Sequence, residues 1–444
     1  METKMDKEQL YQLDTLMKAI PLYGKKVGLR NIERIITELN TIIPLVEYLN
    51  SVHVIHVTGT NGKGSVCKML SEIYTEQGYC TGLFTSPHID VITERIQINN
   101  NNVSGELFYD GYQAVLKICE RLKTEDIEPT FFEWVFSIAL YCFYMKKAKV
   151  LVIEVGIGGR LDTTNILPKK ELSVITSVGL DHQDILGNTL TDIAIEKTGI
   201  LPKNGRLVLG KIDKEAEKVI RQIAVKKEAL VYNIQPNAYE IMDFTDKSID
   251  FSVHNKYYNY ERLHLNTSAH YQINNALIAL LCIHVLQDVL LVDESSVKSG
   301  LDRFFWPGRF ERIQEGIYID GAHNVLGVTT LLESIALLSE SKSYDLLLGM
   351  KQHKDYKAVI RLLLQSGWFK NIYLVELSGG IGVSKQELYD EVSQYSDSVY
   401  YVEDLQQFLQ ERLYKQSALR LLATGSLFLT SDIRKILQEE EAND

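Results

Sequence analysis

Short apolar runs of strand length alternate with segments of helix length along most of this 444-residue chain. Residues 51–57, 149–156 and 172–179 form three such runs, which are rich in β-branched side chains. A strand with one face in water would alternate apolar and polar residues, whereas these runs suit strands that are covered on both faces. Helices packed on both faces of a sheet provide that cover, so we predict an α/β fold with a mostly parallel sheet.

Two changes along the chain predict its domains. Residues from about 230 to 268 are aromatic, β-branched and interrupted by turn residues, which predicts a small antiparallel β-subdomain. The alternation of strand-like and helix-like segments restarts near residue 300. We therefore predict an N-terminal domain of residues 1–302, which includes the β-subdomain, and a C-terminal Rossmann-like α/β domain of residues 303–444. The N-terminal domain carries the glycine-rich stretch TGTNGKGS at 58–65, which predicts a P-loop ATPase-like domain.

Charge and composition exclude several classes of protein. A net charge of −11 argues against general nucleic-acid binding, which needs a basic face. The five cysteines show no C-x-x-C spacing, which suits a reducing compartment. Residues 1–20 lack the uncharged apolar core of a signal peptide, and the most apolar run, residues 131–145, is too short to span a bilayer. We expect a cytoplasmic monomer that binds neither nucleic acid nor membranes.

The stretch HVTGTNGKGS, residues 56–65, follows a predicted strand and precedes a segment of helical periodicity. A glycine-rich turn there can direct several backbone N–H groups into one concavity, and the helix N-terminus favours an anion. The usual phosphate loop reads G-x-x-x-x-G-K-[ST], whereas here Gly64 separates Lys63 from Ser65. Lys63 can reach the β- and γ-phosphates of a nucleotide, and Ser65 can reach Mg²⁺. The predicted nucleotide-binding residues of the loop are Gly59, Thr60, Asn61, Gly62, Lys63, Gly64 and Ser65.

Polar residues also follow two other predicted strands. Glu154 comes directly after apolar strand residues, and His182 follows the run 172–179. Ligands of open α/β sheets bind beyond the carboxyl ends of the strands, so we expect both side chains near the phosphate loop. A carboxylate, an imidazole and a hydroxyl can share one divalent ion beside ATP, and Mg²⁺ suits oxygen ligands best. The alternative for His182 is a strand-end residue that bonds only to the backbone.

Six motifs support a more specific prediction. The chain contains VTGTNGKGS at 57–65, TSPH at 85–88 followed by ERI, EVGIGGRLDTTN at 154–165, GLDHQDILGNT at 179–189, WPGR at 306–309 and DGAHN at 320–324. Together they resemble the family of folylpolyglutamate synthase and dihydrofolate synthase, within the Mur ligase superfamily. GGRLDTTN and DGAHN are specific to this group. The resemblance extends from about residue 20 to TGSLFLTSDIRKIL at 424–437, which is nearly the whole chain.

The resemblance implies that ATP and two Mg²⁺ ions are cofactors. Lys63 is expected on the ATP phosphates and Ser65 on the first Mg²⁺ ion. The second ion is expected to be held by Ser86, Glu154 and His182. A monovalent cation such as K⁺ is a further candidate cofactor.

Lys197 lies in the last turn of a predicted helix, TDIAIEKTGIL, which Thr189 or Thr191 can cap and Gly199 can end. Position alone indicates a lysine favoured by the helix dipole. The resemblance implies instead a carbamylated lysine, an anionic group that supports a Mg²⁺ ion. Carbamylation needs a neutral amine, and burial favours the neutral form because it lowers the pKa of a lysine.

Residues beyond 270 complete the expected ATP site. Asn275 in HYQINNALIALL matches an asparagine that contacts the nucleotide, whereas the histidine of that motif is replaced by Tyr271, to which we assign no role. Arg309 matches an arginine on the ATP phosphates. The resemblance places Asp320 at the ribose or the adenine edge and His323 near the γ-phosphate or the reaction intermediate.

The expected substrate contacts are fewer. The family has a D-K-D stretch, and this chain has His353 in place of its first aspartate. Lys354 and Asp355 correspond to the other two residues and are expected near the incoming glutamate. His88 and Arg95 are candidates for contact with the carboxylate end of the substrate.

These residues predict an ATP-dependent amide ligase. The γ-carboxylate of a reduced folate would take the γ-phosphoryl group of ATP, and L-glutamate would attack the acyl phosphate. Dihydropteroate is a second candidate acceptor, and the sequence does not discriminate between an enzyme with one activity and one with both. Two alternatives are a peptidoglycan-precursor ligase, which should carry an additional N-terminal domain, and a regulatory P-loop NTPase, which should lack the second α/β domain.

Overall fold

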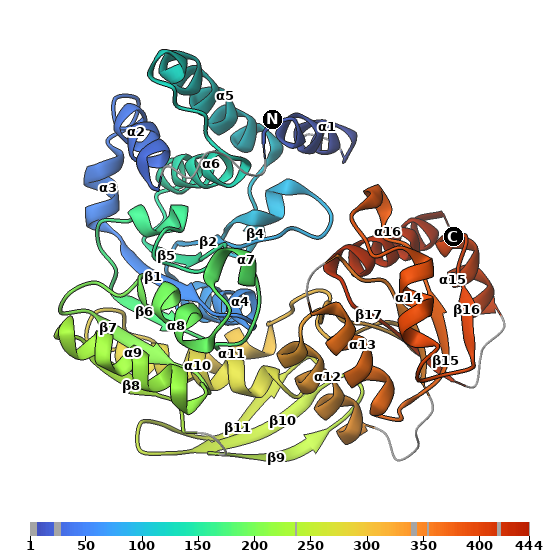
Figure 1. Cartoon of the computed structure of the whole chain (residues 1–444). Coiled ribbons are helices and arrows are strands. Elements are labelled where there is room, and N and C mark those ends of the chain that lie inside the picture. Colours follow the sequence, from blue (N-terminus) through green and yellow to red (C-terminus); the bar gives the residue numbers. More distant parts are fainter. Residues whose placement is uncertain are drawn as a thin grey trace. The chain divides into compact units, whose positions relative to one another are not determined.

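The computed structural model describes residues 7–21, 28–235, 238–338, 344–352, 355–414 and 419–443. The chain forms two compact units, whose elements are labelled in Figure 1. The first unit comprises the described residues up to Ala238, together with His254–Asn259 and Asn274–Phe304. The second comprises Tyr239–Val253, Tyr260–Ile273 and the described residues from Phe305 onwards.

The first unit is built on an eight-stranded sheet with the order β4-β3-β2-β5-β1-β6-β7-β8. All neighbouring pairs from β2 to β8 are parallel, and β3 and β4 add antiparallel pairs at one edge. The strands are β1 (His53–Thr58), β2 (Thr81–Phe84), β3 (Ile96–Ile98), β4 (Asn101–Asn102), β5 (Val150–Glu154), β6 (Leu172–Ile175), β7 (Arg206–Leu209) and β8 (Leu230–Asn233). The three predicted apolar runs are β1, β5 and β6, which lie side by side, so the predicted mostly parallel sheet is confirmed.

Both faces of the central strands are buried, as their composition predicted. In β5, Leu151 and Ile153 join a large apolar cluster with the helices α2, α5 and α6, while Val150 and Val152 point to the opposite face, where β5 contacts α4. The helices of this unit are α1 (Lys7–Lys18), α2 (Arg30–Leu39), α3 (Leu45–Ser51), α4 (Lys63–Glu76), α5 (Gly105–Leu122), α6 (Phe131–Met145), α7 (Gln183–Leu186), α8 (Leu190–Thr198), α9 (Lys214–Lys226), α10 (Gln272–Val285, of which the first two residues belong to the second unit) and α11 (Glu294–Asp302). Three short 3₁₀ helices are η1 (Ile92–Arg95), η2 (Lys123–Glu125) and η3 (Thr163–Ile166).

Helix α6 shows why the most apolar run is a core helix. It begins with a capping box, in which the Thr130 N–H donates to Glu133 Oε2 at 2.7 Å and the Glu133 N–H donates back to Thr130 Oγ1 at 3.4 Å. Most of its aromatic and aliphatic side chains are buried in the apolar cluster. In the parts of the chain that the structure describes, no helix has the length and apolar character needed to cross a membrane.

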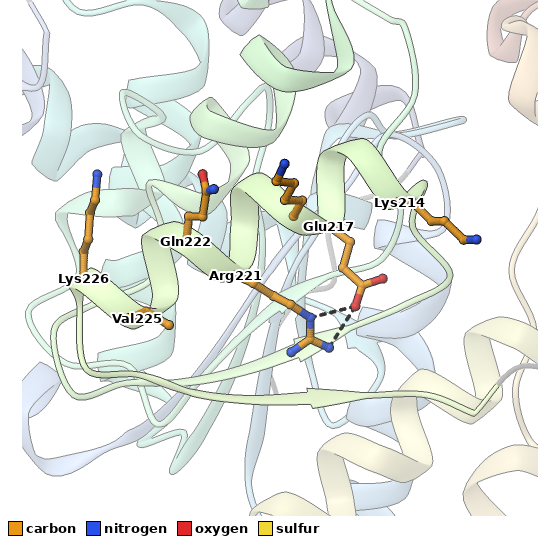
Figure 2. Close-up of a pocket in the computed structure, with 7 residues that line it drawn as sticks. Lys214, Glu217, Arg221, Gln222, Val225 and Lys226 are labelled. Carbon is orange, nitrogen blue, oxygen red and sulfur yellow. Dashed lines mark hydrogen bonds and ion pairs between the residues drawn. The ribbon is translucent and has the colours of Figure 1, made fainter.

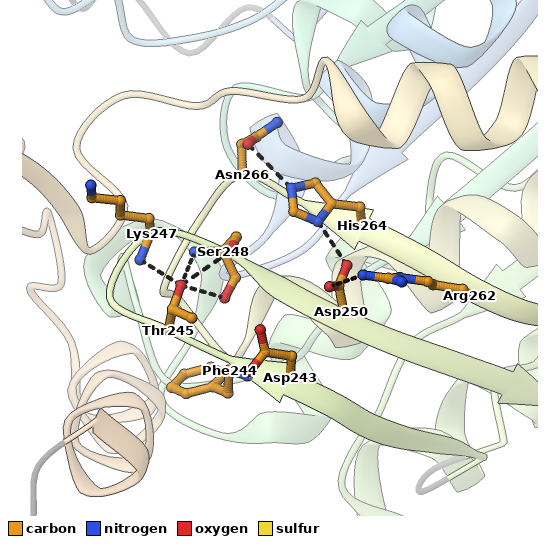
Figure 3. A network of polar contacts seen from close by, with 9 residues as sticks. All are labelled: Asp243, Phe244, Thr245, Lys247, Ser248, Asp250, Arg262, His264 and Asn266. Atoms are coloured by element: carbon orange, nitrogen blue, oxygen red, sulfur yellow. Dashed lines mark hydrogen bonds and ion pairs between the residues drawn. The ribbon is translucent and has the colours of Figure 1, made fainter.

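A three-stranded antiparallel sheet with the order β11-β10-β9 consists of β9 (Tyr239–Phe244), β10 (Ile249–His254) and β11 (Asn259–Leu265). One face carries buried apolar residues such as Phe251 and Leu263. On the other face, the Asp250 carboxylate accepts from Arg262 Nη2 and lies against His264 Nδ1, both at 2.7 Å (Figure 3). This alternation is typical of an antiparallel sheet with one solvated face.

The observed units divide the chain differently from the predicted domains in two respects. The last segment of the first unit ends at Phe304, two residues after the predicted boundary at 302. Most of β9, β10 and β11 is grouped with the second unit. Residues 230–233, at the start of the predicted β-subdomain, form β8 and pair with β7 in the parallel sheet instead. The domain boundaries stay a prediction.

The second unit contains a six-stranded sheet with the order β12-β13-β17-β14-β15-β16. Only the pair β12–β13 is antiparallel among the described pairs of this sheet. Its elements are β12 (Glu311–Gln314), β13 (Ile317–Ile319), α12 (Val325–Leu338), β14 (Tyr344–Leu348), α13 (Tyr356–Gln365), β15 (Phe369–Leu374), η4 (Ser378–Gly380), α14 (Lys385–Val392), β16 (Val399–Tyr401), α15 (Leu405–Tyr414), β17 (Arg420–Thr424) and α16 (Leu427–Asn443). The predicted second α/β unit is therefore confirmed.

Candidate active site

The phosphate loop connects the end of β1 at Thr58 to the start of α4 at Lys63. The segment that follows β6 holds its backbone. The Thr60 N–H donates to the Ser177 carbonyl oxygen at 3.0 Å, and the Asn61 N–H donates to Ser177 Oγ at 2.9 Å. The loop is therefore shaped by a neighbouring segment of the sheet as well as by its own glycines.

Two of its glycines have no space for a side chain. A Cβ atom on Gly59 would lie 1.8 Å from Thr176 Oγ1. Gly62 has a φ of +84°, and a Cβ atom there would lie 2.5 Å from Asn275 Oδ1. Glycine is required at both positions because of this contact distance, and at Gly62 also because of the left-handed backbone. The contact places the predicted nucleotide ligand Asn275, on α10, directly against the loop.

The Lys63 side chain folds back over the loop. Its Nζ atom donates to the carbonyl oxygens of Gly59 and Thr60 at 3.1 and 3.2 Å. The Ser65 side chain lies in the first turn of α4, and the residue is only 2 % exposed. An ammonium group above a glycine-rich turn at a helix N-terminus is an arrangement that favours a bound phosphate.

Ser86 and Glu154 meet at the carboxyl edge of the sheet. The parallel strands β2, β5, β1 and β6 are consecutive neighbours, so their carboxyl ends lie on one edge together with the phosphate loop. Glu154 ends β5 and is buried, and its Oε2 accepts from the Ser86 backbone N–H at 2.9 Å. The structure thus brings together two of the three residues expected around the second Mg²⁺ ion.

His182, the third, follows β6 and has a left-handed backbone with a φ of +48°. Its side chain is 49 % exposed, and its Nε2 lies 3.9 Å from Asp181 Oδ1. Within the described residues, no three His, Cys, Asp or Glu side chains gather closely enough to hold a metal ion by themselves. The expected set contains only two such residues and a serine, so this finding is compatible with Mg²⁺ held by few protein ligands, phosphates and water.

Lys197 is buried near the end of α8, with 3 % of its surface exposed. Burial first, and then the positive charge of Lys63, lower the pKa of its amine to about 7, although Asp181 and Asp162 act in the opposite direction. The amine is therefore largely neutral at slightly alkaline pH. The influence of Lys63 and Asp181 also shows that Lys197 lies close to the phosphate loop and to the segment around His182.

A buried relay of three polar residues was not predicted. Thr164 Oγ1 donates to Asp162 Oδ1 at 2.5 Å. His56 Nε2 lies 2.7 Å from Thr164 Oγ1 and must therefore donate to that hydroxyl oxygen. Asp162 Oδ2 also accepts from the Ile157 N–H at 3.0 Å. These hydrogen bonds connect His56 of β1 to the segment 156–165 and stabilise that segment. The available signal was His56, a histidine between the apolar residues Ile55 and Val57 of the strand, and it did not reveal the partner.

His88 and Arg95, the candidate substrate contacts, bond to each other. Arg95 Nε donates to His88 Nδ1 at 2.8 Å, so the histidine proton is on Nε2, which lies 3.5 Å from Asp14 Oδ1. The Arg95 guanidinium is buried at 5.1 Å from the Phe131 ring centroid. Burial lowers the pKa of Arg95 to about 10, against the attraction of Glu154. Arg95 is thus a buried cation beside the carboxyl edge.

In the second unit, Asp320 follows β13 and is only 2 % exposed. Its Oδ2 accepts from the Tyr271 hydroxyl and from the Phe310 N–H, and its Oδ1 accepts from the Ala322 N–H, all at 2.7 Å. Burial raises the pKa of Asp320, although Arg309 and these donors act to lower it. Tyr271, to which the sequence assigned no role, is therefore a direct partner of a predicted site residue.

The other expected residues of the second unit lie near its loops. Arg309 Nη1 donates to the Gly308 carbonyl oxygen at 3.2 Å, and His323 Nδ1 lies 2.9 Å from the Gly321 carbonyl oxygen. Asp355 is the residue that precedes α13. Lys354 lies outside the described residues. The roles expected for these residues stay predictions.

A hollow of about 830 Å³ lies along α9. It is lined by Lys214, Glu217, Lys218, Arg221, Gln222, Val225 and Lys226, which follow one helix (Figure 2). Within it, Arg221 and Glu217 form an ion pair at 2.8 Å. None of the residues predicted to bind ATP, metal or substrate lines this hollow.

Comparison with known proteins first defines the class. Residues 57–283, more than half of the chain, match the Mur ligase middle domain. The chain therefore contains a Mur ligase middle domain.

Three relatives then define the family. The chain is 32 % identical to the dihydrofolate synthase/folylpolyglutamate synthase of Bacillus subtilis, over 94 % of this chain and 96 % of that protein. It is 30 % identical to the folylpolyglutamate synthase of Lacticaseibacillus casei, over 86 % of this chain and 89 % of that protein. The crystal structure of folylpolyglutamate synthase from Thermotoga maritima matches with a TM-score of 0.82 at 28 % identity, over 98 % of this chain and 97 % of that one. The chain belongs to the folylpolyglutamate synthase/dihydrofolate synthase family. The alternatives of a peptidoglycan-precursor ligase and a regulatory NTPase are not favoured.

Proposed function

We propose that this protein is an ATP-dependent ligase that joins L-glutamate to the γ-carboxylate of a reduced folate. The observation that carries this proposal is the carboxyl edge of the sheet, where a phosphate loop lies beside the buried Glu154 and the Ser86 backbone that is bonded to it. An edge of this kind suits phosphoryl transfer from a nucleotide. The names of the relatives supply the substrate class, since the proteins of Bacillus subtilis and Lacticaseibacillus casei are both named for folate glutamylation.

ATP is proposed to bind with its phosphates on the loop 59–65. A solved structure named as a complex of folylpolyglutamate synthase with AMPPCP, 26 % identical to this chain with a TM-score of 0.79, supports this choice of nucleotide. Lys63 would contact the transferring phosphoryl group, and Asn275 would contact the nucleotide beside Gly62. In the second unit, we assign Arg309 to the phosphates, Asp320 to the ribose or adenine side, and His323 to the γ-phosphate or the intermediate.

The residues at the carboxyl edge fit Mg²⁺. Ser65 and Glu154 are both buried, and oxygen atoms dominate the donor set, as Mg²⁺ prefers. Ser65 would hold one ion, and Ser86, Glu154 and His182 would hold the other. When bound, Mg²⁺ neutralises charge on the phosphate oxygens. A monovalent cation such as K⁺ is a further part of the proposal, as is a carbamate on Lys197.

The proposed reaction has two steps. In the first, the folate γ-carboxylate attacks the γ-phosphorus of ATP, the bond to the bridging oxygen breaks, and ADP leaves. The Lys63 ammonium stabilises the charge on the moving phosphoryl group. In the second, the glutamate amino group attacks the acyl carbon and loses a proton, and inorganic phosphate leaves with the electrons of the broken C–O bond. Lys354, Asp355, His88 and Arg95 are the proposed substrate contacts.

The choice of acceptor is tested directly. The purified protein is incubated with ATP, Mg²⁺ and L-glutamate, together with either tetrahydrofolate or dihydropteroate, and phosphate release and product mass are measured. We expect release only when both an acceptor and glutamate are present. Equal release without either substrate would refute the ligase. Product with tetrahydrofolate alone would indicate one activity, and product with both acceptors would indicate two, as in the name of the Bacillus subtilis relative. We propose a cytoplasmic monomer.

A further inference from the structure

Asp320 joins two loops that the proposed function assigns to ATP. Its Oδ2 receives the Phe310 N–H, directly after Arg309, and its Oδ1 receives the Ala322 N–H, directly before His323. The two loops also bond to each other, because the Gly321 N–H donates to the Gly308 carbonyl oxygen at 2.9 Å. One buried carboxylate therefore determines where both loops lie.

The backbone conformation of these two loops is restricted. Gly308 and Phe310 both have left-handed backbones, with φ values of +67° and +43°. A Cβ atom on Gly321 would lie 2.6 Å from Arg309 Nη1, so the arginine packs directly on the second loop. A left-handed phenylalanine is strained, and its N–H bond to Asp320 helps to hold it in that conformation, together with the Ser268 hydroxyl that donates to its carbonyl oxygen. The position of Arg309 depends on the carboxylate for this reason.

The third donor to that carboxylate is the Tyr271 hydroxyl, at 2.7 Å from Oδ2. Tyr271 lies one residue before α10, and Asn275, in the first turn of the same helix, is in contact with the phosphate loop at Gly62. The chain that carries the phenol thus continues within one helical turn to a predicted nucleotide ligand. Among the titratable and charged groups that the structure describes, Arg309 and Tyr271 act on Asp320, and both lower its pKa.

We propose that Tyr271 is a positioning residue for ATP, whose hydroxyl holds Asp320 so that the loops bearing Arg309 and His323 keep their places. The inference rests on the proposed function for the roles of Arg309 and His323. It assigns a role to the position at which this chain departs from the motif of its family.

A phenol suits this task. Burial and the charge of Asp320 raise the pKa of Tyr271 well above its ordinary value, so the hydroxyl stays a donor over the whole working range of pH. Loss of the hydroxyl would leave Asp320 Oδ2 with one donor in place of two. The ionised carboxylate would then be less favoured, and its pKa would rise.

The experiment compares Tyr271→Phe with Tyr258→Phe in the full-length protein. Tyr258 is a matched control because its hydroxyl also donates to a partner on α10, the Leu277 carbonyl oxygen at 3.0 Å, and it contacts none of the proposed ATP residues through this bond. Three quantities are measured: amide hydrogen exchange of Phe310 and Ala322 without nucleotide, the Kd of ATP at pH 8, and the pH below which ATP binding weakens.

For Tyr271→Phe we expect exchange at both amides and the Kd of ATP to rise about tenfold or more, as for a lost hydrogen bond to a charged group. The acidic limit of ATP binding should move to higher pH by about one unit. Tyr258→Phe should change none of these by more than about twofold. Unchanged exchange and an unchanged acidic limit in Tyr271→Phe would overturn the proposal. Failure of the proposed function is a separate result, because it would be seen as missing ligation by the unmodified protein, whereas amide exchange without nucleotide reports on the Tyr271 bond whether or not the protein ligates.

Discussion

Replacing Lys197 by methionine is expected to stabilise the unmodified protein while removing its activity. The Lys197 amine is buried, and its pKa in the folded protein is about 7, against an ordinary value of 10.5. That difference corresponds to about 5 kcal/mol, which is the free energy that the folded state loses by holding a protonated amine in a buried place. Methionine has a similar length and no charge, so it avoids this cost.

The sign of the pH dependence follows from the two pKa values. An unfolded chain keeps the proton up to about pH 10.5, whereas the folded protein releases it near pH 7. Between these values the unfolded state binds more protons, so the free energy of unfolding rises with pH. The deficit relative to Lys197→Met should therefore be largest below pH 7 and should decline steadily above it.

Urea unfolding from pH 6 to pH 9, in buffers free of carbon dioxide, measures this difference. Lys203→Met is the control, because that lysine side chain is 68 % exposed and should behave like the unmodified protein. Parallel stability curves for the unmodified protein and Lys197→Met would refute the inference of a buried, largely neutral amine.

A second series with ¹³C-bicarbonate tests the proposed carbamate. At pH 8 an amine with a pKa of about 7 is about 90 % neutral, compared with about 0.3 % for an ordinary lysine, so the reactive form is enriched roughly 300-fold. A carbamate signal should appear in the unmodified protein and in Lys203→Met, and should be absent from Lys197→Met. A signal of equal strength in all three proteins would place the modification elsewhere.

Three further changes test the nucleotide loop and its support. Lys63→Ala should lower turnover at least about a hundredfold with either acceptor, by loss of charge stabilisation at the phosphoryl group, while circular dichroism shows an intact fold; substantial turnover would contradict the assigned role. Gly62→Ala should weaken ATP binding, measured by titration, because its Cβ atom meets a side chain at 2.5 Å, whereas Gly78→Ala shares the left-handed strain but has nothing within 4 Å and should leave ATP affinity unchanged. Equal affinity in both variants would remove the steric argument. Thr164→Val should lower the free energy of unfolding by about 2–3 kcal/mol, because His56 loses its hydrogen-bond partner in a fully buried place, and a loss well below 1 kcal/mol in urea unfolding would show that the relay contributes little.

Local physical chemistry explains which parts of the fold were predictable. A run of β-branched residues followed by a glycine-rich turn and a periodic helix constrains its own conformation, and β1, the phosphate loop and α4 were found where the sequence indicated. The capped, apolar α6 is a second example, since its cap and its core side chains are neighbours along the chain. The positions of β1, β5 and β6 in the first sheet therefore followed from composition and periodicity.

The order of the strands was not available from the sequence, because register and neighbour choice depend on contacts between distant residues. The sheet places β5 between β1 and β2, and only that order brings the Ser86 backbone to the Glu154 carboxylate, 68 residues along the chain. The same reason explains why β8 was assigned to the β-subdomain, although it pairs with β7.

By itself, the sequence determined which functional groups this protein contains: a phosphate loop, a strand-end carboxylate, a helix-end lysine and two loops rich in polar residues. Tertiary structure decided what each group can do. Burial makes the amine of Lys197 largely neutral at slightly alkaline pH. The contacts of Arg95 with His88 and the Phe131 ring make a candidate substrate ligand a buried cation. The hydroxyl of Tyr271 reaches Asp320 across 49 residues of chain. Protonation and hydrogen bonding depend on which groups surround an atom, and folding alone brings those groups together.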